Sequence, residues 1–339
     1  MASENEIVRI AVDAMGGDHA PSEVVRGAVQ FASTGQGYVL LVGDPEALQV
    51  ELSQYDSSRL PIRVIPSEGV IHEGEQPALA LRQKPKASVL ISTGLVKRGM
   101  ADACVTIGST GAAMAAAAVI LGLAKGVERP ALGGPVVGIA AETCILDLGA
   151  NVDCRPRQLL SFGAIGDVFA RSFWGHENPR VALLSVGAEA GKGNRQVSET
   201  TEMFEQSGLN FIGNIEANDV PKGAAEVVVC DGFVGNIVMK LTEGLGQRLT
   251  ERLRESLNDK LPEADLDALL DDFYGINNVV ETRGGGPLLG VNGVSVVGHG
   301  SASADAVERA IGMAKLAVDI DFIPRMNRQL EELESRLEA

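Results

Sequence analysis

The chain has 339 residues, of which 45% are hydrophobic and 22% charged, a composition typical of a globular protein with a large core. Its formal net charge of −16 argues against general nucleic-acid binding, because phosphate backbones attract basic surfaces. Only 4% of the residues are aromatic, so Ala, Val, Leu and Ile must build the core, which suits a sheet covered by helices on both faces.

Short apolar runs predict buried strands, and nearly all of these runs end in glycine followed by small polar residues. In chain order they are Ile7–Asp13, Val39–Val42, Ala103–Ile107, Ile145–Leu148, Val181–Val186, Val227–Cys230 and Val294–Val297. Ligands of open α/β sheets bind outside the carboxyl ends of the strands, where glycine lets backbone N–H groups approach closely. The loops therefore predict one composite pocket for a small anionic ligand.

Helical patterns alternate with these strands, which predicts the α/β class, and no low-complexity linker divides the chain. Pro21-Ser22-Glu23 offers a cap for the first helix, and Ser301 or Ser303 with Asp305 does so for the last. The predicted helices are Ser22–Ala32, Pro77–Arg82, Ser88–Arg98, Ala112–Leu123, Pro156–Ser172, Gln196–Gln206, Gly235–Leu257 and Ser303–Phe322.

Residues 237–275 are predicted to form an inserted helical hairpin. Leucines recur every fourth residue from Leu241 to Leu257, and a second helix is expected to begin near Pro262 and to stop at Gly275. The apolar stripe is expected to pack in the core or against a second copy of the chain. A membrane-surface element is the alternative, but it normally needs basic residues and the second helix is acidic.

Two glycine-rich loops are candidate anion sites. Gly108-Ser109-Thr110-Gly111 stands between a strand and an Ala-rich helix, where free N–H groups and the helix dipole favour an anion; a tight turn without a ligand is the alternative. The loop Gly187–Asn194 carries Lys192 between glycines, a combination that suits phosphate, although a solvated lysine is also consistent.

His19 and His299 lie in strand-end loops, where an imidazole could donate to a developing oxyanion, carry a proton or serve only as a structural group. The spacing of histidines and cysteines predicts no zinc site, and we expect neither a metal nor a cofactor. Strand-end carboxylates are expected to orient these side chains or to cap helices rather than to bind an ion: Asp13, Asp18, Asp153 and Asp231.

The cysteines form no Cys-x-x-Cys pair, and three of the four lie in apolar runs, which predicts buried, reduced thiols and a reducing compartment: Cys104, Cys144, Cys154 and Cys230. Met1–Glu6 has no apolar stretch, so no signal peptide is expected, and the longest apolar run, Ala112–Leu123, is too short to span a membrane. A cytoplasmic protein is therefore predicted, with the inner face of the membrane as a peripheral location.

The loop Ile10–Pro21 closely resembles the opening signature of the bacterial acyl-[acyl-carrier-protein]–phosphate acyltransferases. Serine stands at position 109 where that family usually has asparagine, and the segment Thr282–Gly286 also departs from its pattern. Further motifs follow in family order: Asp147–Asp153, Lys192-Gly193-Asn194, Phe211-Ile212-Gly213-Asn214, Asp231–Asn236 and His299-Gly300-Ser301.

The resemblance implies reversible transfer of a long-chain acyl group from the thioester of acyl carrier protein to inorganic phosphate, giving acyl phosphate for glycerolipid synthesis. It implies a three-layer α/β/α fold with a mixed, mostly parallel sheet, like the folds of isocitrate and isopropylmalate dehydrogenases and of phosphate acetyltransferase. Residues 1–339 would form one domain or two interleaved lobes, usually in a homodimer. A membrane glycerol-3-phosphate acyltransferase would use the product.

On this interpretation, Lys192 with the Gly187–Asn194 backbone and Ser109/Thr110 would hold phosphate. His299, or else His19, would donate to the thioester oxygen. The basic residues Arg82, Lys84 and Lys86 could dock the acidic carrier protein, or form an ordinary solvated helix end. The remaining candidates would fix loops or line the substrate site: Asp13, Gly16, Gly17, Gly108, Gly111, Asn151, Asp153, Gly187, Gly193, Asn194, Asp231, Asn236 and Ser301.

Three other functions are consistent with parts of the sequence. A dehydrogenase on the same fold would need a nicotinamide site and usually a carboxylate-bound metal, and neither is evident. A short-chain phosphate acetyltransferase would use acetyl-CoA. A non-catalytic scaffold for lipid-synthesis enzymes would favour a basic hairpin, whereas this hairpin is acidic.

Overall fold

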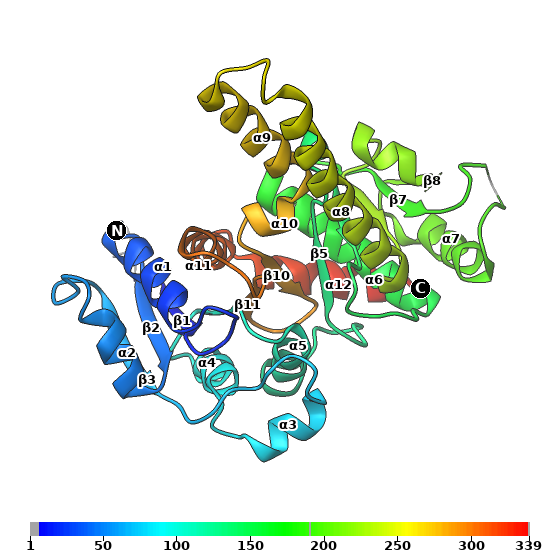
Figure 1. Cartoon of the computed structure of the whole chain (residues 1–339). Helices are drawn as coiled ribbons and strands as arrows, with labels where there is room; N and C mark the ends of the chain where they lie inside the picture. Colours follow the sequence, from blue (N-terminus) through cyan, green and yellow to red (C-terminus); the bar gives the residue numbers. More distant parts are fainter. Residues whose placement is uncertain (1–6, 190, 338–339) are drawn as a thin grey trace, which may run out of the picture. The chain divides into compact units, whose positions relative to one another are not determined.

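A computed structural model describes residues 7–189 and 191–337, which form two units (Figure 1). Unit 1 comprises the described residues up to Ala124 together with Arg283–Arg325. Unit 2 comprises Lys125–Thr282 together with the described residues from Met326 onward. Met1–Glu6, where no signal peptide is expected, lies outside the described residues.

The sheet of unit 1 has the strand order β3-β2-β1-β4-β11-β10, in which every pair is parallel except β10–β11. The register places Asp13 beside Thr106, and Thr106 beside Val297. The carboxyl ends of β1, β4 and β11 therefore lie next to one another. The strands are β1 (Arg9–Asp13), β2 (Tyr38–Gly43), β3 (Ile62–Pro66), β4 (Ala103–Thr106), β10 (Gly286–Leu289) and β11 (Val294–Val297).

The sheet of unit 2 has the order β5-β6-β9-β7-β8, with β5–β6 antiparallel and the other pairs parallel. Its strands are β5 (Ala131–Gly134), β6 (Cys144–Leu146), β7 (Val181–Leu184), β8 (Phe211–Ile215) and β9 (Val227–Val229). The predicted α/β class with a mixed, mostly parallel sheet is confirmed, and every predicted strand is present. Four strands were not predicted: β3, β5, β8 and β10.

The predicted helices of unit 1 start within two residues of the expected positions, and the helix Pro45–Leu52 was not predicted. The predicted helix Ala112–Leu123 begins earlier and is α-helical only to Ala116, followed by a π-helical turn over Ala117–Leu121. Ser303 precedes the last predicted helix as expected, but its side chain makes no capping bond; Glu23 Oε2 accepts from the Ala304 N–H at 2.7 Å. The helices are α1 (Ser22–Ser33), α2 (Pro45–Leu52), α3 (Pro77–Gln83), α4 (Ser88–Lys97), α5 (Thr110–Ala116) and α11 (Ala304–Asp319).

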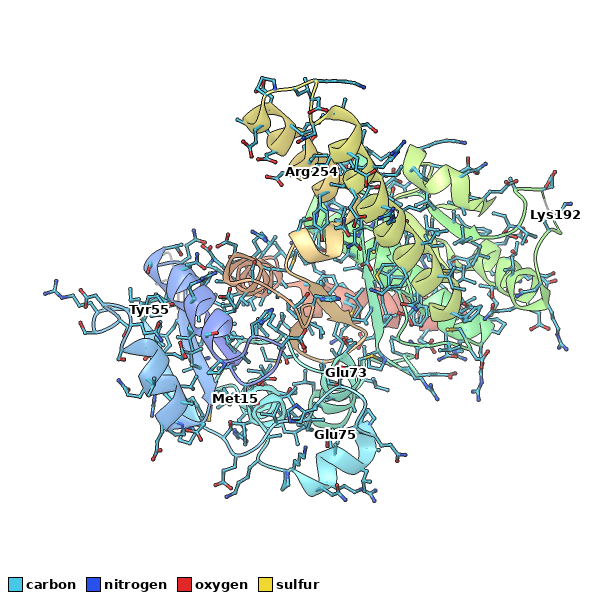
Figure 2. The ribbon with its side chains drawn as sticks, viewed as in Figure 1. Met15, Tyr55, Glu73, Glu75, Lys192 and Arg254 are labelled. Carbon is cyan, nitrogen blue, oxygen red and sulfur yellow. The ribbon has the colours of Figure 1, made fainter. Side chains whose placement is uncertain are left out.

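The helices of unit 2 include two long ones, α8 and α9, which pack as an antiparallel pair tied by an Arg254–Asp267 ion pair at 2.7 Å (Figures 1 and 2). The predicted stop at Gly275 is wrong, because α9 runs two residues further. The helices are α6 (Pro156–Phe169, then a π-helical turn over Ala170–Trp174), α7 (Arg195–Ser207), α8 (Gly232–Leu257), α9 (Glu263–Asn277) and α10 (Val279–Thr282); α12 (Phe322–Leu337) begins in unit 1 and continues here.

The apolar stripe of α8 does not pack in the core. Leu241, Leu245 and Leu249 are 60%, 54% and 49% exposed, whereas Leu266 and Leu270 of α9 are buried. The expectation of core packing is therefore wrong for the first helix of the pair and correct for these two residues of the second. The core of unit 2 lies instead around the sheet, with Ile145, Leu184 and Val228 among its members.

Candidate functional site

In unit 1, the loops that follow β1 and β4 are joined through a buried carboxylate. Asp13, at the end of β1, is 2% exposed, and the Thr106 hydroxyl donates to its Oδ2 at 2.7 Å. The Gly108 N–H in turn donates to the Thr106 hydroxyl at 3.1 Å. Burial raises the pKa of Asp13, and hydrogen bonds including the one from Thr106 oppose that rise. These contacts connect the carboxyl ends of β1 and β4.

Glycine allows the same loops to approach each other. A Cβ on Gly16 would lie 2.8 Å from Asp13 Oδ2 and 2.9 Å from the Gly108 Cα, closer than the two loops permit. Gly17 has a φ of +107°, which side-chain-bearing residues rarely adopt. The Asp18 N–H donates to the Gly300 carbonyl at 2.8 Å and so links the β1 loop to the β11 loop.

His299 is exposed on the β11 loop, and its Nδ1 lies 2.8 Å from the Ser301 hydroxyl. The Ser301 N–H also points at Nδ1, at 3.4 Å. A backbone N–H can only donate, so this contact favours the tautomer that carries its proton on Nε2, which can then donate elsewhere. His19 is also exposed, and its carbonyl accepts from the Ser22 hydroxyl at 3.0 Å, so its backbone helps to start α1.

The loop Gly108–Gly111 begins α5. Ser109 is buried, and its hydroxyl accepts from the Ala112 N–H at 3.4 Å as an N-cap. The hydroxyl that replaces the usual asparagine amide is therefore already engaged within the loop. Thr110 is half-buried, and Gly111 lies close to Pro77 of α3.

In unit 2, Asp147 organises the loop after β6. It is fully buried; Oδ1 accepts from the N–H groups of Leu132 and Ala150, at 3.0 and 3.2 Å, and Oδ2 accepts from the N–H and side-chain amide of Asn151, at 2.6 and 2.9 Å. Burial raises its pKa against these donors. Sequence reasoning did not single out Asp147; the available signal was an acidic residue inside an apolar strand run.

The first turn of α8 sits against this loop. Asp231 Oδ1 caps the helix by accepting from the Val234 N–H at 2.8 Å, and the Gly232 N–H donates to the Asn151 carbonyl at 2.7 Å. A side chain at Gly235 would overlap the Asp147 carbonyl oxygen. Asn236 lies against Gly149 on the next turn. Asp153, by contrast, is exposed and accepts no hydrogen bond from the described residues.

Lys192 lies exposed on the loop between β7 and α7 (Figure 2). The Asn214 amide donates to the Lys192 carbonyl at 3.2 Å, and Asn194 caps α7 by accepting from the Val197 N–H at 2.9 Å. The Lys192 side-chain stem passes over Gly187. Within residues 7–189 and 191–337 its ammonium group pairs with no carboxylate; Ala190 of this loop lies outside the described residues.

The predicted site residues fall into two clusters, one in each unit. Within unit 1 the structure brings together the loops after β1, β4 and β11; within unit 2 it brings together the loops after β6, β7 and β9. That all of them line one composite pocket stays a prediction. Unit 1 holds Asp13, Gly16, Gly17, His19, Gly108, Ser109, Thr110, Gly111, His299 and Ser301; unit 2 holds Asn151, Asp153, Gly187, Lys192, Gly193, Asn194, Asp231 and Asn236.

The cysteine thiols are poor nucleophiles. Burial, reinforced by the charge of Asp147, raises the pKa of Cys154 to about 12, and burial raises the pKa of Cys104 to about 11. Burial also raises the pKa values of Cys144 and Cys230. All four thiols are therefore protonated near neutral pH, which disfavours a covalent cysteine intermediate.

Nearby acids neutralise much of the basic cluster proposed to dock a carrier protein. Lys84 pairs with Glu75 at 2.7 Å and also donates to the Val70 carbonyl, while Lys86 pairs with Glu68 at 2.9 Å (Figure 2 labels Glu75). Paired lysines attract an acidic protein less strongly than free ones, which favours the ordinary helix-end interpretation.

The described residues offer neither a metal-binding cluster nor a membrane-spanning helix. No three His, Cys, Asp or Glu side chains come together in a way that could hold a metal ion. None of the described helices has both the length and the apolar character that crossing a membrane requires.

Residues 8–325 match a family model described as "Fatty acid synthesis protein". The phosphate acyltransferase of Moorella thermoacetica is 44% identical over 315 residues, covering 92% of this chain and 93% of that protein. The phosphate acyltransferase of Pelotomaculum thermopropionicum is 42% identical over 336 residues, covering 98% and 96%.

Solved structures share the fold at low identity. A phosphotransacetylase from Streptococcus pyogenes superposes with a TM-score of 0.62 at 19% identity, covering 93% of this chain and 95% of that one. A 4-hydroxythreonine-4-phosphate dehydrogenase from Klebsiella pneumoniae gives a TM-score of 0.55 at 14% identity, covering 94% and 99%. The expected likeness to phosphate acetyltransferase and dehydrogenase folds is confirmed.

Proposed function

The chain belongs to the phosphate acyltransferase family and is an acyltransferase, and we propose that it moves a long-chain fatty acyl group from acyl carrier protein to inorganic phosphate. The observation that carries the proposal is Lys192, a cation without an acidic partner among the described residues, on a glycine-flanked loop. A cation in that setting suits a free phosphate dianion.

The reaction needs no covalent enzyme intermediate. A phosphate oxygen attacks the thioester carbonyl, a C–O bond forms, the C–S bond breaks, and the sulfur leaves as thiolate. Phosphate is already ionised near neutral pH and a thiol has a pKa of about 8.5, so neither partner requires strong acid–base help. Positioning and stabilisation of the tetrahedral oxyanion then supply most of the rate, and the Nε2–H of His299 is the proposed donor.

The test is to trap acyl phosphate with hydroxylamine, using palmitoyl-carrier protein with and without inorganic phosphate. Product should appear only with phosphate. Lys192→Ala should raise the phosphate KM about 30-fold, because losing a hydrogen bond to a charged group costs about 2 kcal/mol. Lys222→Ala is the matched control, since that lysine of the same unit already pairs with Asp219 at 2.8 Å. An unchanged phosphate KM in Lys192→Ala would remove this residue from the site.

The preferred acyl donor distinguishes the proposed reaction from that of a phosphate acetyltransferase. Acetyl-CoA should be a poor substrate and carrier-bound long chains good ones; the reverse result would make the protein a phosphate acetyltransferase. An absorbance change with NAD and hydroxy acids would instead favour a dehydrogenase. If binding of the carrier protein does not weaken with increasing salt concentration, the basic cluster of Arg82, Lys84 and Lys86 is not its docking surface.

The proposed partners follow from the product. Acyl phosphate is a reactive mixed anhydride, so it must pass quickly to an acceptor enzyme, and we expect a membrane glycerol-3-phosphate acyltransferase to consume it at the cytoplasmic face. A second copy of the chain is the other proposed partner. It is supported by the exposed apolar stripe of α8, because the acidic residues of α9 disfavour an anionic lipid surface.

A further inference from the structure

We propose that a cavity within unit 2 receives the part of the fatty acyl chain nearest the carbonyl. This proposal rests on the function proposed above. The cavity has a volume of about 230 Å³ and lies among β7, β9, α6, α7 and the first turns of α8. Gly193 and Asn194, which follow Lys192 directly, form part of its wall.

The inner wall of the cavity is apolar. Leu159 and Leu183 are each 1% exposed and face it from α6 and β7, and Val238 closes it from α8. An apolar cavity of about 150 Å³ can hold benzene, so a volume of about 230 Å³ has room for roughly nine carbon atoms of a chain. Among the described residues the wall includes no basic side chain, so it does not suit a nucleotide or a second phosphate.

The rim of the cavity is polar on one side. The Ser185 hydroxyl lines it, is buried, and finds no hydrogen-bond partner in the described part of the chain. Asn194 and Asp231, the N-caps of α7 and α8, complete this side. A buried hydroxyl is costly to leave unpaired, so an occupant with a polar head and an apolar tail satisfies the site better than a plain hydrocarbon.

These features together fit an acyl thioester or acyl phosphate. The carbonyl would lie at the rim, within reach of the Ser185 hydroxyl, and the first methylenes would fill the apolar interior. Because Lys192 belongs to the loop that forms the rim, the reacting carbonyl and the proposed phosphate-binding residue would lie in the same region of unit 2.

The first experiment measures how kcat/KM depends on chain length, using butyryl- and octanoyl-carrier protein. Each buried methylene should contribute about fourfold in the wild type. Val238→Phe fills the cavity, so it should reduce the octanoyl-over-butyryl preference at least about tenfold, because the longer chain loses more buried methylenes. The matched control is Ile237→Phe, the adjacent α8 residue, which is 49% exposed and lies outside the cavity wall. An unchanged preference in Val238→Phe, or an equal loss in Ile237→Phe, would overturn the proposal.

The second experiment needs no turnover and no variant. A decanoyl chain with a diazirine at its terminal carbon, delivered as the carrier-protein thioester, should label peptides that contain Leu183 or Val238 in the wild-type protein. Labelling confined to other peptides would contradict the cavity assignment even if acyl phosphate forms. Labelling of these peptides without acyl phosphate formation would support the cavity and refute the proposed reaction, so the two failures are distinguishable.

Discussion

His299 illustrates how a short loop can prepare a donor. Its Nδ1 is occupied by the Ser301 hydroxyl and N–H, so Nε2 is left to donate. Removing an oxyanion donor typically lowers kcat by about 100- to 1,000-fold, so we expect His299→Ala to do so with little change in thermal stability, because the side chain is exposed. His299→Gln should recover part of the rate. His72→Ala, another exposed histidine, is the control, and full activity of His299→Ala would end the assignment.

Asp13 makes stability depend on pH in a direction that can be measured. Burial raises its pKa in the folded protein, so the folded state binds the proton more tightly than the unfolded state. Its stabilising contribution is therefore complete below the unfolded pKa of about 3.8 and is lost as pH rises through the folded pKa.

Asp13→Asn does not titrate and can still accept from Thr106. Its free energy of unfolding minus that of the wild type should therefore increase between pH 4 and pH 7 in urea denaturation. Asp18→Asn, an exposed change in the same loop, controls for the loss of one negative charge. A difference that stays constant or decreases with pH would contradict the assignment.

At the scale of single elements, α8 combines a first turn in which Gly232 and Gly235 are buried with an exposed apolar middle. Gly235 allows the first turn to contact the Asp147 loop, and beyond it Leu241, Leu245 and Leu249 face solvent on one side of the helix. An apolar stripe of this kind on an exposed helix marks an interaction surface more often than a solvated one.

We expect Leu245→Glu to convert a dimer into a monomer, because it places a charge in the middle of an apolar contact. Light scattering coupled to size exclusion measures the mass directly. Val119→Glu, a change at another exposed apolar residue that lies in unit 1, should leave the dimer intact. A monomeric wild type would refute the homodimer, and a dimeric Leu245→Glu would remove the stripe from the interface.

The four strands that sequence reasoning missed have a common cause. β5 and β10 contain glycine or proline, β8 carries Gly213, and β3 has an exposed arginine and ends in proline. Each departs from the continuous apolar run of a doubly covered parallel strand, and β3 and β8 are edge strands, where one side is less buried. Pairing with a neighbouring strand stabilises them, and pairing is not visible in a local window.

At the scale of the whole molecule, the chain builds two units from interleaved stretches, so residues adjacent in one sheet are far apart in sequence. β11 pairs with β4 although the whole main segment of unit 2 lies between them along the chain. No linker composition marks these crossings, because the connecting residues belong to ordered helices and loops.

Local patterning was enough to predict the α/β class, seven of the strands and most helix starts, because burial of a continuous run and the backbone needs of glycine are properties of a few neighbouring residues. The acyltransferase family was identified separately, from the resemblance of its motifs. The burial of Asp147 among four donors, the exposure of the α8 stripe and the cavity behind Asn194 could not be predicted in this way. Each depends on which distant segments pack together, and packing is a property of the folded chain as a whole.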